Sequence, residues 1–304
     1  GADQEVLDIL DLYKKVFEEL YAIPVLKGKK TESEKFAGAD YTTSVEAFLP
    51  SGKAIQCATS HMLGQNFAKA FNISFLDQNE QKQFAWQNSW GISTRSIGIM
   101  IMMHSDNSGL VLPPRVAHNK AVIVPITNKD NKEQILEKAM ELKEFLAEFE
   151  VILDDRDGYT PGWKYNEWEM KGIPVRIEFG PKDMEKHQVV LVRRDTKTKE
   201  FVQIKDLRIR VPKLLEEIQS NLFDKAKRFL ESNIVSAENL GKIKEALENK
   251  KLVLTNLCGS EDCEASIKEL GAKTINMPFD QHPHGYCAIC GSASKMCVYV
   301  GKSY

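Results

Sequence analysis

The sequence has no long apolar run and no large excess of charge of one sign. No stretch reaches the roughly 18 consecutive apolar residues of a membrane-spanning helix. Asp3, Glu5 and Asp8 interrupt the pattern of a secretory signal. The 41 Lys and Arg residues nearly balance 43 Asp and Glu residues, for a formal net charge of −2. That balance argues against a protein that coats nucleic acid with its whole surface, although it permits a local basic patch. We therefore expect a soluble, cytoplasmic protein without a membrane partner.

Cysteine is nearly absent from the first 250 residues, where Cys57 stands alone. Four of the others form two short pairs near the C-terminus, Cys258 with Cys263 and Cys287 with Cys290. Such clustering in an intracellular protein indicates a metal site before a disulfide. Two thiolate pairs brought together by folding make the tetrahedral site that Zn²⁺ prefers, and a site filled by four protein ligands is structural.

Two alternatives to this zinc site remain open. The four thiols could be buried or idle, or His282 or His284 could replace one cysteine as a ligand. Cys57 and Cys297 have no partner in sequence and are expected to be small core residues.

The length of 304 residues suggests two or three domains. The pair Pro113-Pro114 places a boundary near residue 118, and a second boundary falls near residue 220. Between them, alternating strands and helices indicate an α/β unit with parallel strands. Helices are predicted at residues 3–22, 63–71, 97–103, 132–149, 163–171, 206–231, 237–249 and 263–270, and strands at 44–49, 53–59, 84–88, 121–126, 151–153, 173–179, 188–194, 200–204 and 251–256. Residues 27–35 are expected to form a charged loop.

Residues 186–213 form a basic stretch, with nine Lys or Arg against three acids. Clustered cations on a hairpin and the following helix would attract a phosphate backbone, but a solvated charged face is an equally good interpretation. Nearby, Trp163, Tyr165 and Trp168 could stack on unpaired bases or could be core residues.

Several hydrogen-bonding side chains lie together in the segment from Gln56 to His61. We expect this segment at the end of a strand and the start of a helix, where backbone N–H groups can bind an anion. The simpler interpretation makes Ser60 a helix cap and His61 a core residue. Arg95, which follows Ser93-Thr94, has the same ambiguity.

A family resemblance resolves these alternatives. Residues 59–67, TSHMLGQNF, resemble the TSHxLGQNF segment of prolyl-tRNA synthetases of the archaeal and eukaryotic-like type. Residues 88–95, continuing to 109–117, resemble motif 3 of these class II enzymes and its exit. Further segments resemble the family in order along nearly the whole chain: 36–43, 154–157, 161–162, 168–172, 180–183 and 301–304.

The resemblance implies an α/β and α+β multidomain protein. Residues 1–118 would be the distal part of a class II antiparallel-sheet catalytic domain, and 119–220 an α/β anticodon-binding domain with a mixed five-stranded sheet. Residues 221–304 would be a small α+β zinc-binding C-terminal domain. The implied enzyme is a homodimer that activates L-proline with ATP and Mg²⁺ to prolyl-adenylate, and transfers proline to tRNA(Pro).

Residue roles carry over from the same resemblance. Gln56, Thr59, Ser93 and Arg95 would bind ATP, with Arg95 as the catalytic cation that stabilises phosphate charge. His61 would line the proline pocket.

At the far end of the tRNA, one set of residues is expected to read anticodon base edges and another to contact phosphates. The first set is Arg156, Lys164, Glu167 and Arg176, and the second is Arg193 and Arg194. Tyr304 resembles a terminal tyrosine that reaches back towards the active site.

The sequence departs from the family at Cys57, Met62 and Ser105, where relatives usually have Gly, His and Gly. Motifs 1 and 2 are expected before residue 3, so we expect a C-terminal portion of such an enzyme that is inactive by itself. Two rival hypotheses are a non-catalytic tRNA-binding or regulatory paralogue and an unrelated zinc-stabilised interaction module.

Overall fold

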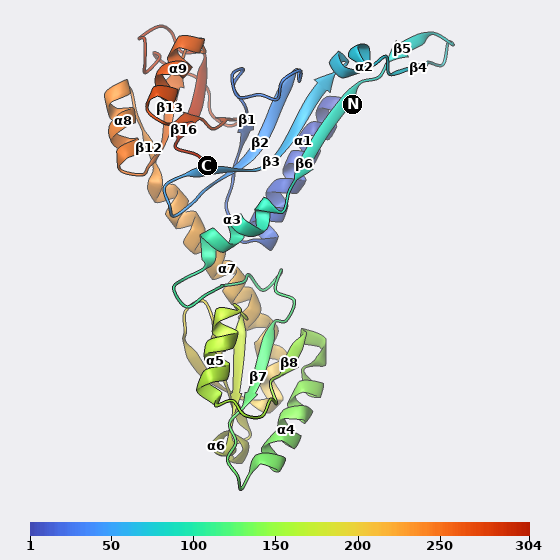
Figure 1. The fold of residues 1–304 in the computed structure, drawn as a ribbon, viewed down its shortest axis with the longest axis vertical. Helices are drawn as coiled ribbons and strands as arrows, with labels where there is room; N and C mark the ends of the chain where they lie inside the picture. Colours follow the sequence, from blue (N-terminus) through green and yellow to red (C-terminus); the bar gives the residue numbers. More distant parts are fainter. The chain divides into compact units, whose positions relative to one another are not determined.

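The computed structural model describes residues 1–304, and the chain forms two compact units (Figure 1). Unit 1 consists of residues 1–18, 23–99 and 227–304, and unit 2 of residues 19–22 and 100–226. No helix in either unit combines the length and apolar character needed to cross a membrane.

Unit 1 contains a five-stranded antiparallel sheet in the order β15-β1-β2-β3-β6. Its strands are β1 (Leu26–Lys29), β2 (Tyr41–Phe48), β3 (Ala54–Gly64), β6 (Gln87–Ile92) and β15 (Met277–Pro278). Helix α1 (Ala2–Lys15), continued by a π-helical turn (Val16–Leu20), packs on this sheet through buried Val6, Leu10 and Phe17. One face of the sheet is thereby covered.

The predicted helix after Ser60 begins later than expected. Ser60 is buried within β3, where it pairs with Trp90 of β6 and Thr43 of β2, and α2 occupies only Asn66–Ala70. Pairing on both sides of β3 overrides the capping tendency of a serine. Beyond α2, a hairpin of β4 (Ser74–Leu76) and β5 (Lys82–Phe84) extends away from the sheet (Figure 1).

The prediction of a loop at residues 27–35 is also wrong for its first residues, because residues 26–29 form β1. This strand pairs with β2 on one side and with β15, from the C-terminal part of the chain, on the other. Gly28 permits that approach, since a Cβ there would lie 2.4 Å from the Met277 carbonyl oxygen. The C-terminal segment thus completes the N-terminal sheet.

The rest of the C-terminal part is a four-stranded sheet in the order β12-β13-β16-β14. The strands are β12 (Ile234–Ser236), β13 (Leu252–Leu257), β16 (Met296–Gly301) and β14 (Lys273–Thr274), and the helices are α8 (Leu240–Glu248) and α9 (Glu261–Glu269). Apolar residues of both helices and of β13 and β16 form its core.

Unit 2 is built on a mixed five-stranded sheet in the order β11-β10-β9-β7-β8, as predicted. The strands are β7 (Ala121–Pro125), β8 (Val151–Leu153), β9 (Val175–Phe179), β10 (Gln188–Arg193) and β11 (Lys199–Gln203). One face packs on α4 (Lys132–Phe145) and α7 (Leu207–Asn233), and the other on α5 (Pro161–Met170).

The chain passes from β7 through α4 to β8, and then through α5 to β9 on the opposite side of β7. The loops that leave β7 and β8 therefore diverge to opposite faces of the sheet. In open α/β sheets such a switch point forms a crevice at the carboxyl ends of the strands.

Candidate functional site

A β-bulge changes which side chains of β3 share a face. The β2–β3 register pairs Val45 with Ala58 but Glu46 with Gln56, so Cys57 is the extra residue. An extra residue shifts the alternation of the strand by one position. Gln56 consequently joins the face of Thr59, although strict alternation along the strand would place the two side chains on opposite faces.

The three predicted ligand-binding residues of β3 lie on this open face. Gln56 is exposed and Thr59 and His61 are partly exposed, while the residues between them are buried. Gly91 of β6 pairs with Thr59, and a Cβ built on Gly91 would meet no atom within 4 Å. The glycine leaves room beside Thr59 for the close approach of a ligand.

His61 is held by its neighbours. Its Nδ1 lies 2.9 Å from the Thr42 Oγ1, and its ring centroid lies 5.0 Å from that of Phe36. Burial lowers the pKa of His61 below its ordinary value, which favours the neutral form of the ring. A neutral imidazole between an aromatic ring and a hydroxyl group suits a small, partly apolar ligand.

Arg95 begins α3 (Arg95–His104) and reaches back to β3, where its Nη1 lies 3.5 Å from the Gln56 carbonyl oxygen. The Ser93 Oγ accepts a hydrogen bond from the Arg95 backbone N–H at 3.3 Å. Arg95 makes no ion pair with any residue of the chain. Its guanidinium therefore keeps donors for an anion from outside.

Arg95 and Gln56 line a hollow of about 270 Å³ together with residues that the sequence analysis did not select. Lys30 and Glu46 form a buried pair there, with the Lys30 Nζ 2.6 Å from the Glu46 Oε1. Lys273 of β14 also lines the hollow, and its ammonium is 3.9 Å from Glu34. Since Glu46 neutralises Lys30 and Glu34 is a distant partner, the hollow favours an anion.

Tyr304 lines the same hollow, in the direction that we expected. Its hydroxyl lies 3.0 Å from the Ser51 Oγ, and the Lys53 ammonium stands 4.7 Å from its ring centroid. No pattern near Arg95 in the sequence could have indicated Lys273, because the pairing of β14 with β16 brings it there.

The four cysteines of the predicted metal site lie together, with all Sγ atoms within 4.8 Å of one another. Cys258 is 3.6 Å from Cys263 and 3.7 Å from Cys290, and Cys263 is 3.8 Å from Cys287. Four Zn–S bonds of about 2.3 Å in a tetrahedron require S–S distances of about 3.8 Å. The thiol cluster therefore fits Zn²⁺ before any metal is placed in it.

Hydrogen bonding and burial shift the pKa values of these thiols in opposite directions. Hydrogen bonding to Ser260 lowers the pKa of Cys258, and hydrogen bonding to Ser292 lowers the pKa of Cys290 to about 6, whereas burial raises the pKa of Cys263 to about 12. Neither His282 nor His284 joins the group. The structure thus favours the four-thiolate set over the histidine alternative.

In unit 2, the expected crevice lies between the loops that leave β7 and β8, as a hollow of about 410 Å³. Asp154, which follows β8, has a fully buried side chain that binds Arg156 through two hydrogen bonds of 2.9 and 2.7 Å. Lys164 donates to the Asp154 carbonyl oxygen at 2.8 Å, and the Trp168 indole to the Asp154 carboxylate at 2.8 Å. Arg156 also pairs with Glu167. Arg156 and Lys164 are therefore already bonded to groups of the protein itself.

The same network supports an aromatic surface. The rings of Tyr159 and Trp163 stack with centroids 4.1 Å apart, and each residue is nearly half exposed. The Arg156 guanidinium lies 5.2 and 5.5 Å from their centroids. Trp163 is thus a surface residue, whereas Trp168 packs in the core beneath α5.

The comparisons with known proteins agree with this architecture. Three family models match: "tRNA synthetase class II core domain (G, H, P, S and T)" at residues 1–104, "Anticodon binding domain" at 120–214 and "Prolyl-tRNA synthetase, C-terminal" at 240–304. The proline–tRNA ligase of Natranaerobius thermophilus is 49% identical over 293 residues, or 95% of this chain and 61% of that protein. The chain belongs to the prolyl-tRNA synthetase family.

Other relatives of this synthetase family come from distant organisms. Proline–tRNA ligase 2 of Bacillus thuringiensis subsp. konkukian is 50% identical over 99% of the chain and 63% of that protein. The cytoplasmic proline–tRNA ligase of Arabidopsis thaliana is 46% identical over 100% of the chain and 60% of that protein. The chain thus spans about three fifths of the length of these synthetases.

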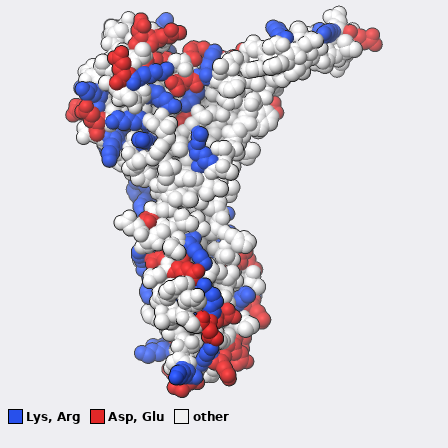
Figure 2. All heavy atoms as spheres, in the orientation of Figure 1, with Lys and Arg blue, Asp and Glu red and all other residues white.

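Within unit 2, the basic stretch at residues 186–213 is largely neutralised. Figure 2 shows acidic and basic side chains interspersed over the part of the molecule that contains α4, α5 and α6 (Pro181–Glu185). Arg208 pairs with Glu148, and Arg210 pairs with Glu200 and Glu217. The local excess of positive charge counted along the sequence is therefore reduced by acids from other elements.

The two arginines expected to contact tRNA phosphates are bonded to acids of the protein instead of being free at its surface. Arg194 is almost fully buried and donates to the Asp106 carboxylate at 2.8 and 2.7 Å and to the Glu169 carbonyl oxygen at 2.9 Å. This arrangement gives Arg194 a structural role, because its guanidinium does not face solvent. Arg193 is bonded to Asp195 and is mostly buried.

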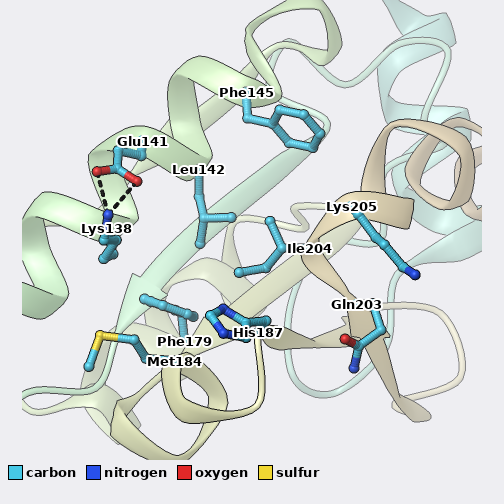
Figure 3. Close-up of a pocket in the computed structure, with 10 residues that line it drawn as sticks. All are labelled: Lys138, Glu141, Leu142, Phe145, Phe179, Met184, His187, Gln203, Ile204 and Lys205. Atoms are coloured by element: carbon cyan, nitrogen blue, oxygen red, sulfur yellow. Dashed lines mark hydrogen bonds and ion pairs between the residues drawn. The ribbon is translucent and has the colours of Figure 1, made fainter.

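Another hollow of the chain lies apart from all the predicted site residues. It measures about 490 Å³ and lies between α4, Phe179 and Ile204. Figure 3 shows apolar side chains lining it, with the Lys138–Glu141 ion pair at its edge and His187 near Ile204. No residue of this hollow combines with a second group to form a reactive pair, so size alone does not mark the site of chemistry.

Proposed function

We propose that the protein carrying these residues is a proline–tRNA ligase, which uses ATP and Mg²⁺ to form prolyl-adenylate and transfers proline to tRNA(Pro). The supporting observation is the bulged face of β3. It aligns Gln56, Thr59 and His61 beside Gly91, with Arg95 at one end. Two segments, residues 56–61 and 91–95, thereby contribute to one surface.

Each residue of this surface has a role in the proposal. Thr59 and Gln56 bind the nucleotide where Gly91 leaves room, Ser93 holds the start of α3, and His61 forms the wall for the proline ring. The proline carboxylate oxygen attacks the α-phosphorus, the bond to the bridging oxygen breaks, and pyrophosphate leaves. Arg95 stabilises the negative charge that develops on the phosphates, which is the largest contribution that a fixed cation can make.

A stable sulfamate analogue of prolyl-adenylate tests the proposal directly. We expect this chain to bind it at least tenfold more tightly than the alanyl analogue in isothermal titration calorimetry. His61→Ala should remove the preference without preventing nucleotide binding. Equal affinity for both analogues, or no binding of either, would contradict the assignment.

We propose that the four cysteines hold one structural Zn²⁺. Zinc would connect the end of β13 and the start of α9 to the turn at residues 287–290, with no vacant position for substrate. Metal analysis with native mass spectrometry should find one zinc per chain. Cys258→Ser should lose it, while Cys297→Ala, which changes a buried cysteine outside the group, should retain it.

We further propose that unit 2 binds the anticodon end of tRNA(Pro). Arg176 is the proposed reader of base edges, since it lies on β9 apart from the Asp154 network. Arg156, Lys164 and Glu167 would instead hold the Tyr159–Trp163 pair for stacking. The domain limits 1–118, 119–220 and 221–304 belong to the same proposal.

Self-association and location complete the proposal. Apolar side chains on and beside the β4–β5 hairpin are exposed, which supports a homodimer in which a second copy covers them. They are Phe71, Ile73, Phe75, Leu76 and Trp86. Sedimentation analysis of Phe75→Ser should show weaker association than the unchanged chain. We propose a cytoplasmic location, which the printed name of the Arabidopsis relative gives for that protein.

A further inference from the structure

One face of the sheet in unit 2 is only half covered. Helix α5 packs on β7 through Val122 and Val124, with Tyr165 and Trp168 against them. The far side of the sheet ends in β11, an edge strand whose Phe201 is 70% exposed. An isolated exposed phenylalanine is ordinary, so its neighbours decide whether it has a function.

The strand register places Phe201 at the end of a defined row. Phe201 pairs with Val190 of β10, and Val190 pairs with Glu178 of β9. In paired strands, directly opposite residues project on the same face. Along this row the Phe201 ring is exposed, whereas Val190 and Glu178 are buried at 8% and 7% exposure.

The adjacent row is cationic. Lys199 pairs with Val192, and Val192 pairs with Arg176. The Arg176 guanidinium carbon lies 4.1 Å from the Tyr165 ring centroid, and its Nε and Nη2 donate to Glu178 at 3.1 and 2.9 Å. Lys199 lies 3.3 Å from the same carboxylate, and its side chain is half exposed.

This combination of groups matches one class of ligand. A flat exposed ring suits a nucleobase, which stacks through its π face. The half-exposed Lys199 ammonium on the adjacent row suits a phosphate. A purely apolar peptide would cover this ammonium without pairing it, and a simple anion would leave the Phe201 ring uncovered.

We propose that Phe201 stacks on one unpaired base of the tRNA, with Lys199 contacting an adjacent phosphate. This inference rests on the proposed function, in which unit 2 binds tRNA. Phe201 is therefore an additional recognition residue on the edge strand, beyond the readers expected from the sequence.

Fluorescence anisotropy with a labelled tRNA(Pro) transcript and this chain tests the inference. Loss of one stacked base corresponds to a weakening of roughly 5- to 100-fold, which we expect for Phe201→Ala. Phe201→Trp should retain affinity, and its indole emission should be quenched on binding. Ile209→Ala, which removes an equally exposed apolar side chain from α7, should change affinity less than twofold. Lys199→Ala should reduce the slope of log K against log salt by about one unit.

The outcomes separate this inference from the proposed function. If the unchanged chain binds no tRNA, both fail. If it binds and Phe201→Ala binds equally well, only the stacking role fails. Self-association that Phe201→Ala abolishes, with RNA affinity unchanged, would identify β11 as a protein interface and overturn the inference.

Discussion

Arg95 beside β3 makes no ion pair, whereas Arg156 after β8 is bonded to both Asp154 and Glu167. Each was expected to contact substrate, and each lies next to a hollow. An unpaired guanidinium is ready for an incoming phosphate, because no existing bond has to break first. A paired guanidinium instead holds neighbouring side chains in place, which for Arg156 are the stacked rings of Tyr159 and Trp163. Cations of the same type are therefore proposed to bind ligand in unit 1, whereas in unit 2 they hold other side chains in place.

Acid should affect unit 2 through a buried histidine. Burial lowers the pKa of His104 to about 4, with a further decrease from Lys225 and an opposing increase from its hydrogen bond to the Tyr21 carbonyl oxygen. Because the unfolded chain has a histidine pKa near 6.5, it takes up the proton first. Stability is complete above about pH 6.5 and should fall by about 3 kcal/mol as the pH decreases to 4.

Hydrogen exchange followed by mass spectrometry measures this loss of stability. Peptides from β9 are followed between pH 4 and 7, and their rates are corrected for intrinsic exchange. His104→Gln keeps a donor towards Tyr21 but does not titrate, so its stability should vary less over this range. An equally steep dependence in His104→Gln would show that another group is responsible.

Removing Arg156 should lower stability rather than only binding. Arg156→Ala leaves the buried Asp154 carboxylate with Lys164 and Trp168 as partners. The variant loses two charged hydrogen bonds to a buried carboxylate, so it should lower the stability more than the loss of an exposed ion pair does. Urea unfolding measures the change.

Arg208→Ala is the matched control, since its pair with Glu148 is exposed on both sides. It should cost less than about 0.5 kcal/mol. Similar losses in both variants would remove the distinction between organising cations and surface cations.

The sequence predicted the components of these sites better than their geometry. Spacing alone identified Cys258 and its three partners, because thiolate pairs have few other uses at that separation. It could not show the bulge at Cys57, which depends on β2, nor that Ser60 continues a strand. Charge counting over 186–213 failed for a related reason, since the neutralising acids Glu148 and Glu178 come from other elements.

Arg95→Ala should show the opposite behaviour to Arg156→Ala. It removes charged hydrogen bonds to phosphate, so the affinity for ATP with Mg²⁺ should fall about 20-fold, or close to 2 kcal/mol. The unfolding midpoint should hardly change, because the only hydrogen bond of the guanidinium within the protein is the 3.5 Å contact with the Gln56 carbonyl oxygen. Titration calorimetry measures the affinity, and Lys69→Ala removes one exposed cation of α2 as a control. A fall in stability with unchanged ATP affinity would reverse the comparison.

Lys273→Ala should have the smallest effect. Lys273 lines the same hollow as Arg95, but its ammonium lies 3.9 Å from Glu34, so part of its charge is already compensated. The expected loss of ATP affinity is about threefold, in the range of a partly screened ion pair. Glu34→Gln should remove that compensation and raise the affinity by a similar factor. If Glu34→Gln weakens ATP binding instead, the Lys273–Glu34 pair holds β14 in position. Lys273 would then have an organising role, like Arg156 in unit 2.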